Sequence, residues 1–293
     1  MTPSEQVERW RQAGTSLTAG ADRVFVVDAP PDGTAVAPPL LVIHGFPTSS
    51  HDFADVLPQL RAGRRVVLLD LPGYGLSDKP DRAYSLFEQA SVVEAVVAEL
   101  GLDEVDLLTH DMGDSVGGEL LARDLDGATP FVIRRRVLTN GSIYLDLAHL
   151  TSGQQFLAAL PDERLPEETA PTRRALIDAL WATMAPDASV EDDTVATAAE
   201  LVVRDGGNRL LPRLIRYLAE RREHEHRWTG AIERHPAPMT IVWGEVDPIA
   251  DWSMTDRLVE RRPDARRTRL ARVGHYPMVE VPDAFAAAVL DAL

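Results

Sequence analysis

One aspartate, Asp111, stands where its side chain could act as a nucleophile. The residues before it, 105–109, form an apolar run that predicts a buried strand, and a helical pattern begins soon after Gly113. A strand, a sharp turn and a helix in this order form a nucleophile elbow, which presents one side chain at the carboxyl end of a strand. A carboxylate there is already ionised at neutral pH, because its ordinary pKa is about 3.9. It could therefore attack a saturated carbon without the help of a base.

A different alignment of the same segment places a serine at the tip. Gly113-Asp-Ser-Val-Gly117 matches the pattern G-x-S-x-G, in which Ser115 would be the nucleophile. The elbow residue must follow its strand almost directly, and Ser115 lies four residues after Asp111, a full turn into the helix. The spacing therefore favours Asp111 and leaves Ser115 as the alternative.

Strand and helix patterns alternate on both sides of this elbow. Such alternation predicts an α/β fold, in which a mostly parallel sheet is flanked by helices. The run at 40–43 is apolar throughout, as is typical of a strand that is buried on both faces. Further strands are expected at residues 23–28, 65–70, 105–109, 136–139, 239–243 and 267–273, and core helices at residues 86–100, 115–124, 253–260 and 284–293.

Residues 141–235 lack strand patterns and show amphipathic helical stretches instead. We expect helices at residues 153–160, 172–184, 193–204 and 210–228, with prolines between several of them. An insertion at this place, just past the elbow, predicts a helical lid over a pocket. The core then comprises residues 1–140 and 236–293, and a helical domain unrelated to the site is the alternative.

The composition limits the location and the partners of the protein. Its 293 residues are 45% hydrophobic and 26% charged, which is ordinary for a globular enzyme with one large α/β domain. A formal charge of −16 disfavours nucleic acid and anionic membranes as partners. The chain has no cysteine, no apolar core of a signal peptide and no run near the ~18 apolar residues that span a bilayer. We therefore expect a cytoplasmic protein, and the sequence does not indicate its oligomeric state.

No cofactor or metal site is expected. The sequence has neither the G-x-G-x-x-G pattern nor a P-loop that would bind the phosphates of an organic cofactor. His224 and His226 have the spacing of two metal ligands but lack an evident third one, and their charged surroundings indicate a solvent-facing helix end. His44 and His110 flank predicted backbone turns, where a structural role is expected.

Five short segments follow predicted strands in this chain. They are His44-Gly-Phe-Pro, Asp70-Leu-Pro-Gly-Tyr-Gly, His110-Asp-Met-Gly, Trp243-Gly-Glu-Val-Asp and Gly274-His-Tyr-Pro. Together they resemble the α/β-hydrolase superfamily over residues 20–293, which implies the α/β-hydrolase fold. His-Gly-Phe-Pro and His-Asp-x-Gly resemble its aspartate-nucleophile branch of epoxide hydrolases and haloalkane dehalogenases. The variant His-Asp-x-Gly-Asp and the segment after Asp70 are also similar to the mesoderm-specific-transcript homologues.

This resemblance implies a two-step hydrolysis of a small apolar organic substrate. Asp111 attacks carbon and forms an alkyl-enzyme ester, His275 activates the water that cleaves the ester, and Asp247 orients the imidazole. Histidine suits the second step because it titrates near neutral pH. The backbone N–H groups of Phe46 and Met112 are expected to face the oxyanion, and each such donor contributes ~3–4 kcal/mol.

The halide-binding residues of haloalkane dehalogenases have no obvious counterpart here. These enzymes commonly hold the halide with side-chain donors at the positions of Phe46 and Met112, and neither side chain has an N–H group. Trp181 is one lid residue that could supply a donor instead. Fluoroacetate dehalogenases tend to have arginine at the position of Met112, which is also missing.

Epoxide opening instead requires a donor that protonates the leaving oxygen, and epoxide hydrolases use two lid tyrosines for this. Tyr217 resembles one of them. For the second, Phe156 is nearest in spacing but has no hydroxyl, while Tyr144 lies somewhat too early. We therefore expect an epoxide hydrolase. The alternatives are a haloalkane dehalogenase, an ester or lactone hydrolase, and a non-catalytic small-molecule binding protein with the same fold.

Asp114 departs from the glycine that is common at its position in epoxide hydrolases. A carboxylate in the first turn of a helix is favoured by the helix dipole. The sequence gives Asp114 no further role.

Overall fold

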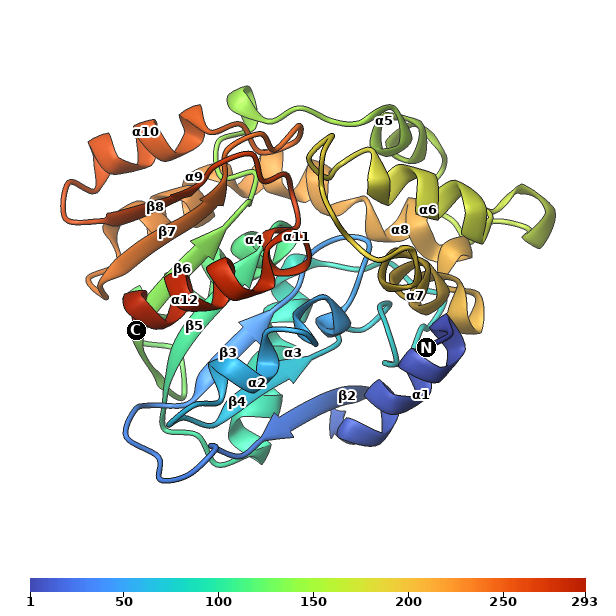
Figure 1. The fold of residues 1–293 in the computed structure, drawn as a ribbon. Coiled ribbons are helices and arrows are strands. Elements are labelled where there is room, and N and C mark those ends of the chain that lie inside the picture. Colours follow the sequence, from blue (N-terminus) through green and yellow to red (C-terminus); the bar gives the residue numbers. More distant parts are fainter.

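A single eight-stranded sheet organises the protein, whose computed structural model describes residues 1–293 (Figure 1). The strand order is β1-β2-β4-β3-β5-β6-β7-β8. Strands β1 and β2 pair antiparallel, as do β2 and β4, and all other neighbours are parallel. The mostly parallel sheet flanked by helices confirms the predicted fold class. The strands are β1 (Thr15–Ala19), β2 (Asp22–Ala29), β3 (Leu40–Ile43), β4 (Val66–Leu69), β5 (Glu104–His110), β6 (Val132–Thr139), β7 (Met239–Gly244) and β8 (Arg266–Leu270).

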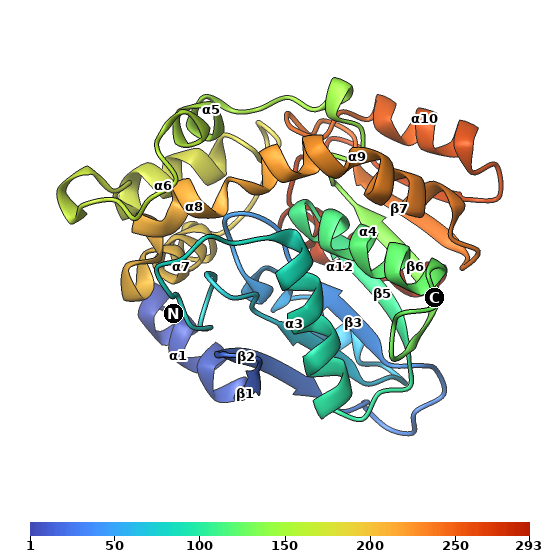
Figure 2. The same cartoon turned by 180° about the vertical axis from the view of Figure 1, so that it is seen from behind.

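The central strands are apolar because both faces of the sheet are covered. Every residue of β3, β4 and β7 is buried. Burying one such Val, Leu or Ile side chain stabilises the fold by roughly 1.5–3 kcal/mol. Helices α2 (Leu57–Leu60) and α12 (Pro282–Ala292) cover one face (Figure 1), and α3 (Leu86–Glu99) and α4 (Met112–Leu125) cover the other (Figure 2). Helix α10 (Ser253–Arg261) packs beside β8, and the short α11 (Pro277–Glu280) precedes α12.

Helix α9 (Tyr217–Arg234) lies directly on α4 and joins the inserted segment to the core (Figure 2). A Cβ added at Gly118 would lie 3.0 Å from Cβ of Trp228, so a glycine is needed for this close approach. The Trp228 indole N–H donates to Glu119 at 2.8 Å, which satisfies a buried donor at the same contact. The end of the insertion is thereby fixed to the helix that follows the elbow.

The rest of residues 141–235 lies beyond the carboxyl ends of the parallel strands (Figures 1 and 2). Helix α1 (Pro3–Ala13) packs against α7 from outside this segment. None of the helices in the protein combines the length and the apolar character needed to cross a bilayer. The inserted helices are α5 (Ser152–Ala159), α6 (Arg173–Trp181), α7 (Asp192–Val203) and α8 (Leu211–Leu214), with 3-10 turns η2 (Leu145–Leu147), η3 (Glu167–Thr169) and η4 (Arg204–Leu210); η1 (Ser50–Phe53) belongs to the core.

Several predicted boundaries differ from the structure. Helix α4 begins at Met112 and not at residue 115, because the elbow turn is a single residue, Asp111. Strand β8 ends at Leu270 and does not reach residue 273, since Arg272 has φ 61°, which an extended strand cannot contain. The predicted helix 210–228 is two helices, α8 and α9, and α9 continues to Arg234.

Two elements at the N-terminus were not predicted. Helix α1 is mostly polar and is fixed by a capping box between Thr2 and Glu5. Strand β1 is an edge strand with mostly exposed residues, so it lacks an apolar run. It pairs with β2 through a two-residue turn that begins at Gly20, whose φ of 64° suits a hairpin.

Candidate active site

The turn between β5 and α4 holds Asp111 in a strained conformation. Its φ is 51° and its ψ is −118°, values that residues other than glycine rarely adopt. The next turn of backbone requires Gly113, because a Cβ there would lie 2.5 Å from the carbonyl oxygen of Ile43 and 2.7 Å from that of His44. The strand, the tight turn and the helix therefore form an elbow with Asp111 at its tip.

The two carboxylate oxygens of Asp111 have different surroundings. Oδ2 accepts a 2.8 Å hydrogen bond from the backbone N–H of Phe46, and the backbone N–H of Met112 also stabilises the carboxylate. Oδ1 lies 3.9 Å from Nε2 of His275. Burial raises the pKa of Asp111, while His275 and the two backbone donors lower it. Oδ2 is thus held by the backbone N–H of Phe46, and Oδ1 faces the imidazole.

His275 is anchored on one side and faces Asp111 on the other. Its Nδ1 lies 2.8 Å from Oδ2 of Asp247, and its backbone N–H donates to the carbonyl of Thr183 in the inserted segment at 3.0 Å. Burial alone would lower the pKa of His275, but the carboxylates of Asp247 and Asp111 raise it to about 9. The imidazole is therefore protonated at neutral pH when Asp111 carries a charge.

Each oxygen of Asp247 accepts two hydrogen bonds. Oδ1 accepts from the backbone N–H groups of Ile249 at 2.7 Å and Ala250 at 3.1 Å. Oδ2 accepts from Nδ2 of Asn140 at 2.7 Å and from His275. The side chain is buried, and this set of donors fixes its orientation toward the imidazole.

Asn140 is a residue of this site that was not identified from the sequence. Besides donating to Asp247, it accepts a 3.0 Å hydrogen bond from the backbone N–H of Gly244 through Oδ1. Its φ is 50°, and asparagine tolerates this left-handed region better than most residues. The available signal was an Asn-Gly pair, Asn140-Gly141, directly after a strand.

Ser115, the alternative nucleophile, lies inside α4. Its side chain is buried, and its Oγ has no hydrogen-bond partner. The imidazole of His275 contacts Asp247 and faces Asp111, and no contact joins it to Ser115. The residues that have the geometry of a triad are therefore Asp111, His275 and Asp247.

Asp114 is buried in the first turn of α4, just after Asp111. Its Oδ1 accepts a hydrogen bond from the Thr109 hydroxyl, and its Oδ2 has no partner. A Cβ at Gly141 would lie 2.0 Å from this Oδ2, so the chain is tightly packed around it. Burial raises the pKa of Asp114 well above its usual range. Burial therefore works against the helix dipole, which would favour the charged form of this first-turn carboxyl group.

Among the candidate residues for the leaving group, Tyr217 lies nearest to the elbow. It is buried at the start of α9, and its ring centroid lies 5.7 Å from that of Phe46. No protein group hydrogen-bonds its hydroxyl. Burial and the charge of Asp111 raise the pKa of Tyr217 well above its usual range, so the hydroxyl keeps its proton.

The structure does not bring the other three candidates to Asp111. The hydroxyl of Tyr144 donates to Glu233 at 2.9 Å on α9. Phe156 is 59% exposed on α5. Trp181 is partly buried at the end of α6, where it packs against the core. Of the four residues, only Tyr217 contacts a residue that holds the nucleophile.

An apolar cavity lies under the inserted helices, with roughly 580 Å³ of empty space including its mouth. We call it the apolar cavity. Phe46 and Tyr276 form part of its wall, so it adjoins the residues that hold Asp111 and follow His275. A concave, mostly apolar lining of this kind suits a small organic molecule. Its other lining side chains include Leu157, Leu176, Leu180, Leu211 and Ile249.

Three of the other histidines, His44, His110 and His224, have structural contacts. His44 Nε2 accepts a 3.0 Å hydrogen bond from the backbone N–H of Leu71, and His110 Nε2 donates to the carbonyl oxygen of His275 at 2.8 Å. His224 packs edge-on against Phe87, with ring centroids 4.9 Å apart. No three His, Cys, Asp or Glu side chains lie close enough together to hold a metal ion.

Comparison with known proteins identifies the family to which the chain is similar. Residues 38–282 match the family model described as alpha/beta hydrolase fold. The chain is 41% identical over 291 residues to a Mycobacterium tuberculosis protein named "Putative hydrolase LipZ", and the match covers 99% of each chain. It is 30% identical over 296 residues to the mesoderm-specific transcript homolog protein of Bos taurus, a match that covers 96% of this chain and 86% of that one.

Solved structures share the fold at low sequence identity. The epoxide hydrolase CorEH, solved without ligand, superimposes with a TM-score of 0.74 and 20% identity, covering 95% of this chain and 97% of that one. At this identity the likeness extends to the arrangement of strands and helices alone.

Proposed function

This chain belongs to the alpha/beta hydrolase fold family as a hydrolase, and we propose that it uses Asp111 as a nucleophile to convert an epoxide to a diol. One observation carries the proposal: Oδ2 of Asp111 is held by the Phe46 N–H, while Oδ1 is free and faces His275. A carboxylate held in this way can form an ester through Oδ1, with the carbonyl oxygen already on its donors.

In the first step, Oδ1 attacks an epoxide carbon and the C–O bond of the ring opens. The product is an ester between Asp111 and the substrate, with an alkoxide that must receive a proton. The free hydroxyl of Tyr217 next to Phe46 supports an epoxide as the substrate, because neither the Phe46 nor the Met112 side chain has a donor that could hold a halide. The side chain of Met112 accepts a hydrogen bond from the Tyr74 hydroxyl instead.

Ester formation also prepares the second step. It removes the negative charge of Asp111, which is one of the charges that raise the pKa of His275. The imidazole then loses its proton to solvent more readily, and the neutral imidazole can take a proton from water that attacks the ester carbon. Negative charge develops on the former Oδ2, where the N–H groups of Phe46 and Met112 stabilise it. Collapse of this intermediate releases the diol and restores Asp111.

The first test compares epoxides with bromoalkanes on the purified protein. A panel of aryl and alkyl epoxides and of bromoalkanes is incubated with the wild type and with Asp111→Ala, and diol and bromide are measured. We expect diol from the wild type and none above background from the variant. Bromide without diol would instead indicate that the substrate is a haloalkane and not an epoxide.

Two further variants complete this test. Ser115→Ala should retain activity, because Oγ of Ser115 does not contact the triad. Ester hydrolysis that is lost in Ser115→Ala and kept in Asp111→Ala would contradict the proposed nucleophile. Binding of a ligand by both the wild type and Asp111→Asn, with no turnover by the wild type, would favour a binding protein instead.

A further inference from the structure

Three successive backbone N–H groups at His275 and its two neighbours all have defined acceptors. The N–H of Gly274 donates to Oε2 of Glu280 at 2.9 Å, and that of Tyr276 donates to Oε1 of the same side chain at 3.1 Å. The N–H between them, that of His275, donates to the carbonyl oxygen of Thr183 at 3.0 Å. The backbone that carries the imidazole is therefore held from two directions, by Glu280 and by the inserted segment.

Glu280 also binds the inserted segment directly. Its Oε2 accepts a second hydrogen bond, from the backbone N–H of Ala185 at 2.9 Å. Glu280 is the last residue of α11 and is 8% exposed. Its three hydrogen-bond donors are all backbone N–H groups, which satisfy a carboxyl group that is removed from water. One buried side chain thus connects the backbone on both sides of His275 with the insertion.

Gly274 is required for this close approach. A Cβ added at Gly274 would lie 2.5 Å from the backbone nitrogen of Ala185 and 2.9 Å from Oε1 of Glu280. The first of these atoms belongs to the backbone and cannot move aside as the end of a flexible side chain can. Glycine therefore allows residues 183–185 to pack directly on the turn that follows β8.

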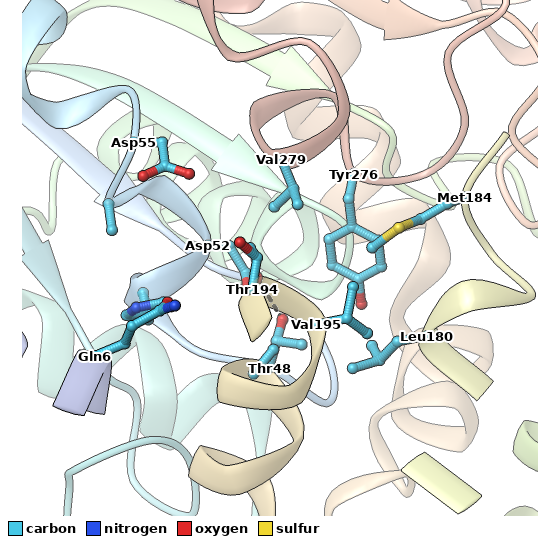
Figure 3. A pocket seen from close by; sticks show the side chains of 13 residues that line it. Gln6, Thr48, Asp52, Asp55, Leu180, Met184, Thr194, Val195, Tyr276 and Val279 are labelled. Atoms are coloured by element: carbon cyan, nitrogen blue, oxygen red, sulfur yellow. Dashed lines mark hydrogen bonds between the residues drawn. The ribbon is translucent and has the colours of Figure 1, made fainter. Parts of the chain in front are cut away.

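These contacts lie between two cavities. Thr183 lines the apolar cavity, and Met184 lines a second cavity, which Figure 3 shows from close by. Tyr276 lines both of them. A substrate in the apolar cavity therefore packs against the same segment that holds the backbone of His275.

We infer that Glu280 is a positioning residue for the second step: it fixes His275 relative to the inserted segment, so that the imidazole can activate the water that cleaves the ester. This inference rests on the proposed function and deepens it. Asp247 holds the ring of His275 through Nδ1, whereas Glu280 holds the backbone on both sides of it. Both contacts are needed, because a displacement of about 1 Å can slow a reaction by about 10²-fold. Ester formation needs no base, so the loss of Glu280 should slow the hydrolysis of the ester and not its formation.

Glu280 also acts on His275 through its charge. Burial alone would lower the pKa of His275, whereas the carboxylates of Asp247, Asp111 and Glu280 raise it to about 9. Replacing the carboxylate of Glu280 by a neutral amide should therefore lower the pKa of His275. The other titratable groups near the imidazole are His110, Asp52, Asp114 and Tyr276.

The test measures both steps in a single turnover. Styrene oxide is mixed with excess enzyme at a series of pH values, and the ester on Asp111 and the diol are followed by rapid quench and mass spectrometry. Glu280→Gln keeps the size of the side chain but has one acceptor oxygen in place of two, and Glu280→Asp keeps the charge. Asp283→Asn is the matched control, because Asp283 is a nearby exposed carboxyl group that binds the side chain of Gln59.

We expect ester formation to stay near the wild-type rate in all three variants. The rate of ester hydrolysis should rise with pH as His275 loses its proton, and its plateau should fall by about 10-fold to 100-fold in Glu280→Gln. The midpoint of this rise should move to lower pH in Glu280→Gln and stay near the wild-type value in Glu280→Asp. Asp283→Asn should change neither the plateau nor the midpoint.

The rate of hydrolysis is measured on molecules that have already formed the ester, so an unfolded fraction of a variant does not enter it. An unchanged plateau in Glu280→Gln would overturn the inference. A lower plateau with an unmoved midpoint would also overturn it, because such a result indicates a role in packing alone. Both outcomes leave Asp111 as the nucleophile, whereas no ester on Asp111 in any of the proteins would overturn the proposed function.

Discussion

His275 faces Asp111 without bonding to it: Nε2 lies 3.9 Å from Oδ1, whereas Nδ1 lies 2.8 Å from Oδ2 of Asp247. The first distance exceeds that of a hydrogen bond, and the second is typical of one. The imidazole is thus fixed by Asp247 and leaves Oδ1 of Asp111 free. In this arrangement His275 is better placed to activate a water molecule beside an ester than to take a proton from Asp111.

His275→Gln should trap the covalent intermediate. Glutamine cannot act as a base, so ester formation continues while its hydrolysis slows by about 10²-fold to 10⁴-fold. Intact-protein mass spectrometry after incubation with an epoxide should show the mass of the substrate added to the variant, and peptide mapping should locate it on Asp111. The double variant with Asp111→Asn is the control and should show no addition. An adduct on Ser115 would contradict the assignment.

The stability of the protein should depend on pH through His275. Its pKa is raised from 6.5 to about 9, so between these values the folded state binds more protons than the unfolded state. The free energy of unfolding should therefore fall as pH rises through about 9, by on the order of 3 kcal/mol in total. Urea unfolding at several pH values from 6 to 9.5 measures this slope. The slope should be smaller in His275→Gln, and an unchanged slope would assign it to other groups.

The contribution of Asn140 to turnover should depend on its side-chain amide more than on its backbone conformation. Asn140→Ala removes the donor to Asp247 and also places alanine at φ 50°. Asn140→Gly removes the same donor but accepts this φ without strain. We expect both variants to slow ester hydrolysis, and the loss of the buried hydrogen bond to cost about 1–3 kcal/mol of stability. Asn140→Ala should be the less stable of the two; equal turnover in wild type and Asn140→Gly would show that the amide is not needed.

The elbow could be predicted because the residues that form it are neighbours in the sequence. An apolar run ending at residue 109, followed by Asp111 and then by Gly113, determines the strand, the turn and the helix within a few residues. The alternation of strand and helix patterns likewise predicted the sheet. The start of α4 was misplaced because one residue, Asp111, makes the whole turn.

Contacts between distant segments were much harder to predict. Asn140 reaches Asp247 across 107 residues. Phe156 was considered because of its spacing, but α5 turns this side chain to solvent. In an inserted segment, helical periodicity gives the position of helices but not the direction in which each one faces.

Gly113→Ala and Gly153→Ala should have opposite effects on stability. The added methyl group at Gly113 would lie 2.5 Å from a backbone oxygen of β3, which cannot move without displacing the strand. We expect a loss of several kcal/mol, in the upper range for single substitutions. At Gly153, in the exposed first turn of α5, the nearest atom lies 3.8 Å away, so alanine should stabilise by about 0.5–1 kcal/mol. Thermal unfolding of the two variants measures both, and a stable, active Gly113→Ala would contradict the tight elbow.

Tyr217→Phe should distinguish an epoxide from a halide as the natural class of substrate. Its hydroxyl has no protein partner, adjoins Phe46 and keeps its proton, because burial raises its pKa. If it orients and polarises the epoxide oxygen, the variant should form the ester on Asp111 at least about tenfold more slowly with epoxides. A bromide ion leaves without needing a proton, so ester formation from a bromoalkane should be little changed. Single-turnover rates with styrene oxide and 1-bromohexane measure the two effects.

Tyr144→Phe is the matched control for this comparison, because the Tyr144 hydroxyl is bound to Glu233 and does not reach the elbow. It should leave both rates near the wild type. A loss with both substrates in Tyr217→Phe would instead indicate that the hydroxyl supports the packing of α9 on Phe46, since a change in the wall of the apolar cavity affects every substrate that binds there. A loss confined to epoxides would leave proton donation or polarisation as the physical role of the hydroxyl, because the removed atom is then important only when the leaving atom is oxygen.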